Sequence, residues 1–465
     1  MSNEWWRLSA VELGQAIARG DTTAVAVAES HLGRIEQVNG SLNAIVEVRP
    51  DEVLAEAARA DQDLKNSGAR SSLHGVPFTV KTNIDVTGYA TTEGVAAFAD
   101  RIATSDAPAV EKMRASGAVV LARTNMPDFG LRIHTDSSLH GLTRNPWDAT
   151  RTAGGSSGGE GSAIASGQSP IGLGNDIGGS VRNPAYCNGI ASIKPGISRI
   201  PEGNETSTLM RLMHQQLLLQ QGVMARDIRD VRAGLQIAMG SHPRDPLAVD
   251  LPLDGPAVSR RVALVAEPAY GTTDPEVAEG VRRAGAALSD AGYEVEELEI
   301  PAFFEAMMTW SELITAGGSI YGEESQALMG DGGRRFLELT GGLFPAPTHE
   351  SVQRAFAAFE DAFTLWNAFM LEHPYIVGPV WTHRPFTHGF DIESPESALK
   401  VIETFRFVLP ANLFGLPAAC VPTGVINGLP TGVQVITRRF REDLALNAAE
   451  VIQNAWGIIT PIDPR

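Results

Sequence analysis

The sequence predicts an α/β protein, a single large domain with a central twisted mixed β-sheet covered by helices on both faces. Short apolar runs alternate with amphipathic helical segments, an order typical of a buried sheet between helices. A helical segment over 108–117 separates the apolar runs 76–80 and 118–121, and such a crossover implies parallel strands. No tandem repeat and no linker rich in Pro, Ser or charge divides residues 1–465.

Residues 1–70 are expected to be helical. Ser9 and Glu12 have the spacing of a capping box, in which each side chain bonds the backbone N–H of the other residue. Two further helices are expected over 24–38 and 51–65, each with apolar residues along one face.

The second half of the chain repeats the alternation. Asp274 followed by Pro275 marks a helix start, with Asp as N-cap and Pro at the first helical position. The expected strands are 262–265, 295–300, 418–422 and 432–436, and the expected helices are 274–292 and 442–456.

Composition excludes several classes of protein. The net charge of −18 argues against nucleic acid or an anionic membrane as a partner. The two cysteines, Cys187 and Cys420, belong to no CxxC pair, so no structural zinc and no disulfide framework are expected. The first ten residues lack the apolar stretch of a signal peptide. We therefore expect a cytoplasmic monomer or homodimer that acts on a small molecule.

Glycine and serine concentrate in one segment. Twelve of the 47 glycines lie in the 43 residues 154–196, and apolar, nearly uncharged stretches there indicate burial rather than an exposed linker. The segment has no phosphate-binding motif, so a serine nucleophile with an oxyanion hole is the stronger interpretation. Residues 154–158 also satisfy G-x-S-x-G, the nucleophile elbow of α/β-hydrolases, with His373, His383 and His388 as candidate partners.

The chain resembles the amidase signature family of serine hydrolases from about Leu8 to Trp456. The Ser-rich block GGSSGGEG is the most specific motif. The other matching segments, in order, are 75–83 (GVPFTVKTN), 124–127 (TNMP), 145–148 (NPWD), 174–182 (GNDIGGSVR) and 428–434 (GLPTGVQ).

The resemblance implies a Ser-cis-Ser-Lys triad with no histidine and no cofactor. By residue-to-residue correspondence, Ser180 is the nucleophile, Ser156 the bridging serine after a cis peptide, and Lys81 the base. Lysine can accept a proton only when neutral, and burial lowers its pKa. Lys81 follows the apolar run 76–80, whereas spacing alone would not favour it over Lys194.

The residues around Ser180 have structural interpretations, because charged groups in an apolar segment need partners. Asp176 and Arg182 are expected to form a structural ion pair or loop anchor, and Ser157 to hydrogen-bond the loop. The expected oxyanion hole consists of the backbone N–H groups of Ile177, Gly178, Gly179 and Ser180.

Substrate preference depends on more variable segments. The substrate-binding candidates are Asn125, Met126, Gly130 and Leu131. The Leu- and Met-rich segment 202–221, which contains Leu209 and Met210, could form a lid or a plain core helix. Aromatic residues in 303–310 and 375–390 favour hydrophobic or aryl amides such as anilides, and carbamates (urethanes) or esters. The alternatives are a glutaminase-like subunit of a tRNA amidotransferase and an α/β-hydrolase-type esterase that uses Ser156. A metal site at His383, His388 and Asp391 is a weaker hypothesis than an ordinary loop.

Overall fold

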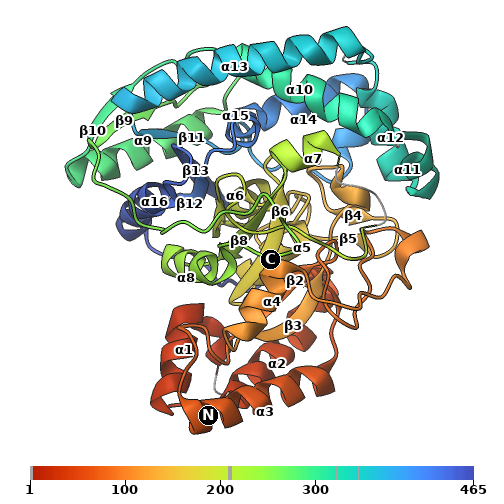
Figure 1. The fold of residues 1–465 in the computed structure, drawn as a ribbon, viewed down its shortest axis with the longest axis vertical. Helices are drawn as coiled ribbons and strands as arrows, with labels where there is room; N and C mark the ends of the chain where they lie inside the picture. The colour runs from red at the N-terminus through yellow and green to blue at the C-terminus, as the bar shows by residue number, and fades with distance from the viewer. Residues whose placement is uncertain (1–3, 208–211, 321, 344) are drawn as a thin grey trace.

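A mixed β-sheet forms the centre of the molecule (Figure 1). The computed structural model describes residues 4–207, 212–320, 322–343 and 345–465. Within these residues eleven strands form one sheet, in the order β1-β3-β2-β6-β8-β7-β12-β13-β11-β9-β10. Their bounds are β1 Ile45–Glu47, β2 Pro77–Lys81, β3 Val119–Thr124, β6 Ile171–Asp176, β7 Ala191–Lys194, β8 Gln220–Ala225, β9 Arg261–Leu264, β10 Glu294–Glu297, β11 Tyr375–Pro379, β12 Ala418–Ile426 and β13 Leu429–Thr437.

Helices cover the sheet. They are α1 Ala10–Arg19, α2 Ala24–Leu42, α3 Pro50–Ser67, α4 Pro108–Ala115, α5 Gly158–Ala165, α6 Arg182–Asn188, α7 Met213–Leu218, α8 Ile228–Ala238, α9 Pro275–Asp290, α10 Phe303–Ile320, α11 Gly322–Leu328, α12 Asp331–Thr340, α13 His349–Glu372, α14 Pro395–Thr404, α15 Leu409–Leu413 and α16 Glu442–Trp456. In the described part of the chain, no helix is both long and apolar enough to cross a bilayer.

The predicted crossover and the predicted mixed sheet are confirmed. β2 lies parallel to β3, with α4 between them in the chain, and it also lies parallel to β6. β6 and β7 each pair antiparallel with β8, and β12 pairs antiparallel with β13. The chain is therefore an α/β domain whose parallel and antiparallel strands share one sheet.

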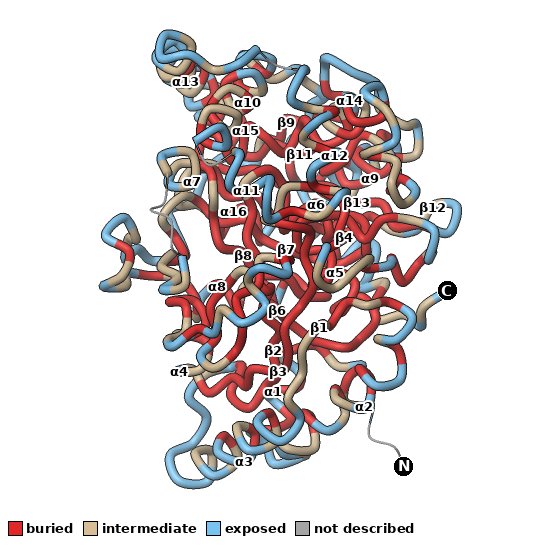
Figure 2. The backbone as a smooth tube through the Cα atoms, turned by 90° about the vertical axis from the view of Figure 1, so that its right-hand side faces the viewer, coloured by how far each residue is buried: buried red, intermediate tan, exposed pale blue. Residues whose placement is uncertain are grey.

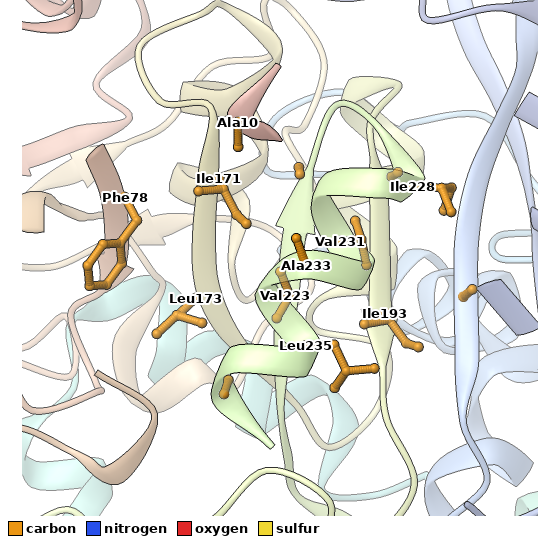
Figure 3. Close-up of a cluster of buried hydrophobic side chains, with 14 of the residues drawn as sticks. Ala10, Phe78, Ile171, Leu173, Ile193, Val223, Ile228, Val231, Ala233 and Leu235 are labelled. Carbon is orange, nitrogen blue, oxygen red and sulfur yellow. The ribbon is translucent and has the colours of Figure 1, made fainter. Parts of the chain in front are cut away.

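Each face of the sheet buries alternate residues, as the two-residue period of a strand requires. Val433 and Val435 pack in the core under α8, α9 and α16, whereas Cys420 and Met224 pack on the side of α5 and α6. Figure 3 shows the first of these cores, where side chains of α8 lie over β6, β8 and β7. Figure 2 shows buried backbone along the central strands and exposed backbone over much of α3. The sheet is thus covered on both faces.

The N-terminal segment is helical, as predicted. Both hydrogen bonds of the Ser9–Glu12 capping box are present at the start of α1. The three-residue strand β1, between α2 and α3, was not expected. Its pairing partner is β3, and such a distant partner leaves no mark in a local pattern.

Several expectations about single elements differ from the structure. Asp274 precedes α9 but its carboxylate does not cap it, because Oδ2 accepts the N–H of Arg384 at 2.9 Å. β10 ends at Glu297 rather than at residue 300. In the segment 202–221, Leu209 and Met210 lie outside the described residues, and Gln220 already belongs to the central strand β8.

Candidate active site

Lys81 is the last residue of β2, and its side chain is completely buried. Its Nζ donates to Ser156 Oγ at 2.7 Å and to Asn175 Oδ1 at 2.8 Å. Asn175 is in turn held by Asn83, whose Oδ1 accepts from Asn175 Nδ2 at 3.0 Å. Burial lowers the pKa of Lys81 from 10.5 to about 7. A buried amine that is neutral near pH 7 and touches a serine hydroxyl can act as a base.

Glycines make room for Ser156. The peptide bond between Gly155 and Ser156 is cis, as the resemblance implied. A Cβ on Gly155 would lie 2.6 Å from the backbone of 132–133, so only glycine fits there. Gly130 has φ +68°, and a Cβ on it would lie 3.1 Å from Ser156 Oγ. Gly155 thus lets the segment 132–133 pack against the backbone before Ser156, and Gly130 lets its own backbone lie close to the hydroxyl.

Ser180 lies in the turn that joins β6 to α6, and it is 6% exposed. Its carbonyl accepts the N–H of Ser157 at 3.1 Å, which ties this turn to the segment that holds Ser156. The backbone N–H groups of Ile177, Gly178 and Ser180 make no hydrogen bond to any other described residue. These three donors are available to an oxyanion.

The expectation for the fourth donor, Gly179, is not met. Its N–H already donates to Asp176 Oδ1 at 2.7 Å. Gly179 has φ +93°, and a Cβ there would strike the side chain of Asn183 at 2.4 Å. The role of this glycine is to let the turn close onto Asp176.

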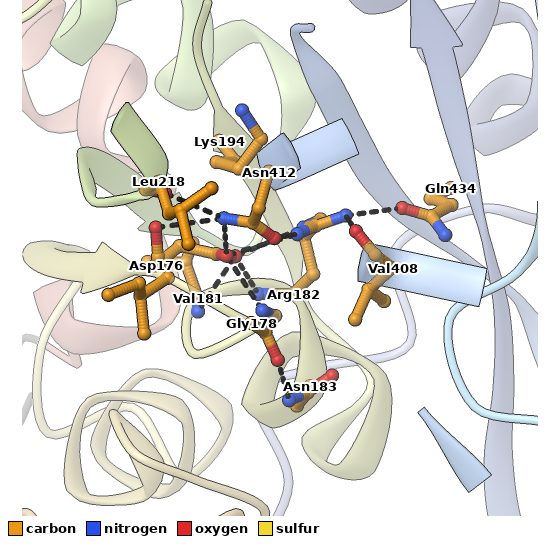
Figure 4. A network of polar contacts seen from close by, with 12 residues as sticks. Asp176, Gly178, Val181, Arg182, Asn183, Lys194, Leu218, Val408, Asn412 and Gln434 are labelled. Carbon is orange, nitrogen blue, oxygen red and sulfur yellow. Dashed lines mark hydrogen bonds and ion pairs between the residues drawn. The ribbon is translucent and has the colours of Figure 1, made fainter. Parts of the chain in front are cut away.

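Asp176 and Arg182 form a buried ion pair with 3.0 Å between Nη2 and Oδ1 (Figure 4). Arg182 also donates to Gln434 Oε1 and Asn412 Oδ1, and Asn412 Nδ2 donates back to Asp176. Burial alone would raise the pKa of Asp176, but Arg182 outweighs it and holds that pKa well below its usual range. The pair anchors the turn that carries Ser180 to β13 and α15, as expected of a structural ion pair.

Trp310 on α10 packs on the same turn. Its Nε1 donates to the carbonyl of Ile177 at 2.9 Å, and a Cβ on Gly178 would lie 2.8 Å from its ring. The indole therefore holds in place the backbone that carries two of the free N–H groups. The aromatic character of 303–310 is visible in the sequence but this contact is not, because 133 residues separate the partners.

A family model described as "Amidase" matches residues 26–446. The chain belongs to the amidase signature family. It is 41% identical over 463 residues to an indoleacetamide hydrolase of Bradyrhizobium diazoefficiens, with coverage of 98% of this chain and 87% of the relative. It is 31% identical over 489 residues to one of the subunits of the glutamyl-tRNA(Gln) amidotransferase of Symbiobacterium thermophilum, with coverage of 97% and 96%.

The fold is also that of solved amidase structures. A bacterial aryl acylamidase of the amidase signature family superposes with a TM-score of 0.84 at 23% identity, with coverage of 98% of this chain and 96% of that one. Membership of the family makes the chain a hydrolase of amide C–N bonds.

Other predicted site residues of this amidase differ from expectation. The Ser157 hydroxyl is buried and has no hydrogen-bond partner among the described residues, so only the backbone of Ser157 joins the loop. Asn125 is buried, and its side-chain amide donates to Gly141 and Thr143. Its Oδ1 accepts the N–H of Met126, so the amide is not free to bind substrate.

The remaining substrate-binding candidates follow Asn125 in the chain. Met126 is fully buried, and Leu131 is half-buried in the turn after Gly130. Gly130 lies next to the site, because a Cβ on it would be 3.1 Å from Ser156 Oγ.

The histidines of this amidase have other partners. His383 bonds Thr272 and Thr382, and His388 bonds the carbonyl of Ala149. The ring nitrogens of His373 have no hydrogen-bond partner among the described residues. The esterase interpretation requires a histidine bonded to the hydroxyl of Ser156. In the structure Lys81 makes that hydrogen bond instead. Within the described ranges, no group of three or more His, Cys, Asp or Glu side chains could hold a metal.

Proposed function

We propose that Ser180 is the nucleophile of this amidase, that Ser156 relays its proton, and that neutral Lys81 accepts it. The proposal rests on one observation: Lys81, fully buried and with its pKa lowered to about 7, donates to Ser156 Oγ at 2.7 Å. A serine hydroxyl is a weak nucleophile at neutral pH and needs such a base.

The steps follow from this arrangement. Ser180 Oγ bonds to the amide carbon while its proton passes to Ser156, and the proton of Ser156 passes to Lys81. The carbonyl oxygen becomes an oxyanion, which the N–H groups of Ile177, Gly178 and Ser180 stabilise. The relay then runs backward and protonates the leaving nitrogen as the C–N bond breaks. The acyl group is now an ester of Ser180. Water attacks the ester carbon and gives a proton to the same relay. The ester C–O bond then breaks, the relay returns that proton to Ser180 Oγ, and the carboxylic acid leaves.

A covalent label tests the nucleophile. A fluorophosphonate, which reacts with activated serines, should give an adduct on Ser180 in the intact protein, located by peptide mass spectrometry. Ser180→Ala should lose both the adduct and amide hydrolysis. Ser157→Ala is the matched control, because this neighbouring hydroxyl has no hydrogen-bond partner among the described residues. An adduct on Ser156 in the wild type would overturn the assignment.

For the substrate, we propose an amide with an aromatic or other apolar acyl group. A cavity of about 200 Å³ lies between α7 and α10 and is lined by apolar side chains that include Leu217, Leu313 and Ile320. Leu313 lies one helical turn from Trp310, which packs on the nucleophile turn at Ile177. The relative at 41% identity is named an indoleacetamide hydrolase, which supports an aromatic acyl group.

A substrate panel tests this preference. Indoleacetamide and phenylacetamide should exceed acetamide in kcat/KM by about 10- to 100-fold, the worth of one buried aromatic group. Ala316→Phe, which would fill the cavity, should reduce that ratio and leave acetamide hydrolysis unchanged. Anilides, aryl carbamates and aryl esters complete the panel. Faster cleavage of acetamide than of the aromatic compounds would overturn the proposal.

A second candidate, the glutaminase-like subunit of a tRNA amidotransferase, is favoured by the 31% identity to a subunit of such an enzyme. We propose instead an enzyme that acts alone on a small amide, with no nucleic-acid partner, because the net charge of −18 opposes tRNA. Amide hydrolysis by the purified chain would support this. Activity only with added partner subunits would favour the second candidate.

A further inference from the structure

Glu160 is a buried carboxylate in the Ser-rich block, in the first turn of α5 and four residues after Ser156. It is fully buried, and it accepts hydrogen bonds from the hydroxyls of Thr79 and Thr124, the latter at 2.7 Å. A Cβ on Gly172 of β6 would collide with Glu160, so the carboxylate fits into a gap left by a glycine. The side chain therefore lies within the sheet of the active site without touching the serines.

The spacing of α5 and β2 explains this position. Thr79 and Lys81 are two residues apart on β2, so their side chains share one face about 6.6 Å apart. Ser156 lies two residues before α5 begins, and Glu160 lies in the first turn of that helix. Ser156 contacts Lys81, and Glu160 contacts Thr79 on the same face of β2.

The neighbouring strand β3 supplies the second hydrogen bond to Glu160. Thr124, which bonds the other oxygen of Glu160, is the register partner of Lys81 in the β2–β3 pair. The carboxylate thus bridges the strand that carries Lys81 and the neighbouring strand.

Among the carboxylates that the structure describes around Lys81, Glu160 differs in its lack of a paired cation. Three carboxylates raise the pKa of Lys81 against the effect of burial, in decreasing order Glu93, Asp176 and Glu160. Glu93 pairs with Arg101 at 3.4 Å and Asp176 pairs with Arg182 at 3.0 Å. Glu160 has no ion-pair partner in the part of the chain that the structure describes.

Two cations act on Glu160 from the strands packed against it: Lys81 from β2 and Arg123 from β3. Arg123 donates to the carbonyl of Ile84 and not to the carboxylate. Burial raises the pKa of Glu160 to about 7, despite the hydrogen bonds from the two threonines. Glu160 and Lys81 therefore titrate in the same pH range and are coupled.

We propose that Glu160 is a positioning residue for the base: its carboxylate holds β2 and β3 together under Lys81, and its charge sets the pH at which Lys81 becomes neutral. This inference rests on the proposed role of Lys81. A nearby negative charge stabilises the ammonium form, so the carboxylate delays the loss of the Lys81 proton as the pH rises.

The pH dependence of Ser180 labelling by a fluorophosphonate tests the inference without a known substrate. Labelling should increase as the pH rises through the pKa of Lys81, because only the neutral amine accepts the proton. Glu160→Gln keeps the shape and removes the charge, so the increase should move about one pH unit lower. Glu160→Asp keeps the charge, so its increase should remain near that of the wild type at a reduced rate.

Asp230→Asn is the matched control. Asp230 is also a buried carboxylate with a raised pKa, but it binds the N–H groups of Ala10 and Val11 at the start of α1 rather than any group of the site. The substitution should lower stability and leave the labelling profile unmoved. A Glu160→Gln profile that superposes on the wild type, or a Glu160→Asp shift as large as that of Glu160→Gln, would overturn the inference.

Lys81→Met separates this inference from the proposed function. If Ser180 is still labelled at the wild-type rate in Lys81→Met, the proposed triad fails. If labelling is lost there but Glu160→Gln leaves the pH profile unmoved, only the role of Glu160 fails.

Discussion

The two buried lysines of the sheet, Lys81 and Lys194, are alike in almost every respect except their partners. Each is the last residue of its strand, β2 or β7, and neither side chain is exposed. Burial lowers the pKa of each from 10.5 to about 7. A lowered pKa therefore does not by itself distinguish a base from a structural lysine.

Their hydrogen bonds separate them. Lys81 Nζ donates to the hydroxyl of Ser156 and to the side chain of Asn175. Lys194 Nζ donates to the main-chain carbonyl of Pro195 at 2.8 Å. Of the two, Lys81 is the lysine that contacts a hydroxyl from which it could accept a proton. The difference teaches that the relay, and not the basicity, marks the candidate base.

The largest expected effect is on catalysis. Lys81→Met should lower kcat/KM for an aromatic amide by about 100- to 10,000-fold, the usual contribution of a positioned general base. Lys194→Met should retain most of the activity, because no reacting group touches Lys194. Steady-state kinetics on both purified variants would measure this, with circular dichroism to show that each is folded. Equal losses in the two variants would abolish the distinction.

The sequence predicted the fold class because many of its signals are local. The Ser9–Glu12 cap, the helix starts at Ala24 and Glu442, and the strand pattern of 418–422 all depend on neighbouring residues, and all are confirmed. Five strands of the sheet were not predicted, because they are defined by pairing with distant strands; they are β1, β6, β7, β8 and β11.

The site divides in the same way. The motifs identified Lys81, Ser156 and Ser180, and the structure brings Lys81 and Ser156 together. The turn that carries Ser180 is held by distant residues: Trp310 bonds Ile177 across 133 residues, and Asn412 bonds Asp176 across 236. No local pattern records such contacts. A choice between Lys81 and Lys194 was likewise impossible from spacing, since both follow apolar strands and both become buried.

The next effect concerns stability, where the two lysines should behave alike. Between about pH 7 and 10.5 the unfolded chain holds a proton on Lys194 that the folded chain lacks. The free energy of unfolding should therefore rise with pH in this window, by about 1.4 kcal/mol per pH unit for each lysine. Lys194→Met lacks this contribution.

Urea unfolding of the wild type and of Lys194→Met at pH 7, 8 and 9 would measure the difference, and the other titrating groups cancel between the two proteins. Lys81→Met should flatten the wild-type slope by the same amount, although the two variants differ greatly in activity. A slope that is unchanged in both variants would mean that neither lysine is neutral in the folded chain.

The smallest expected effect comes from the carbonyl oxygen that accepts a hydrogen bond from each lysine. The acceptor of Lys194 is a backbone group that no substitution removes, whereas that of Lys81 is the Asn175 side chain. Asn175→Ala should lower kcat/KM about five-fold, because one hydrogen bond contributes about 1 kcal/mol to the position of Nζ. Asn83→Ala, which removes only the support of Asn175, should have a smaller effect. If Asn175→Ala left kcat/KM unchanged, Lys81 would be oriented by Ser156 alone, and the contact with the hydroxyl would be the whole of the difference between the two lysines.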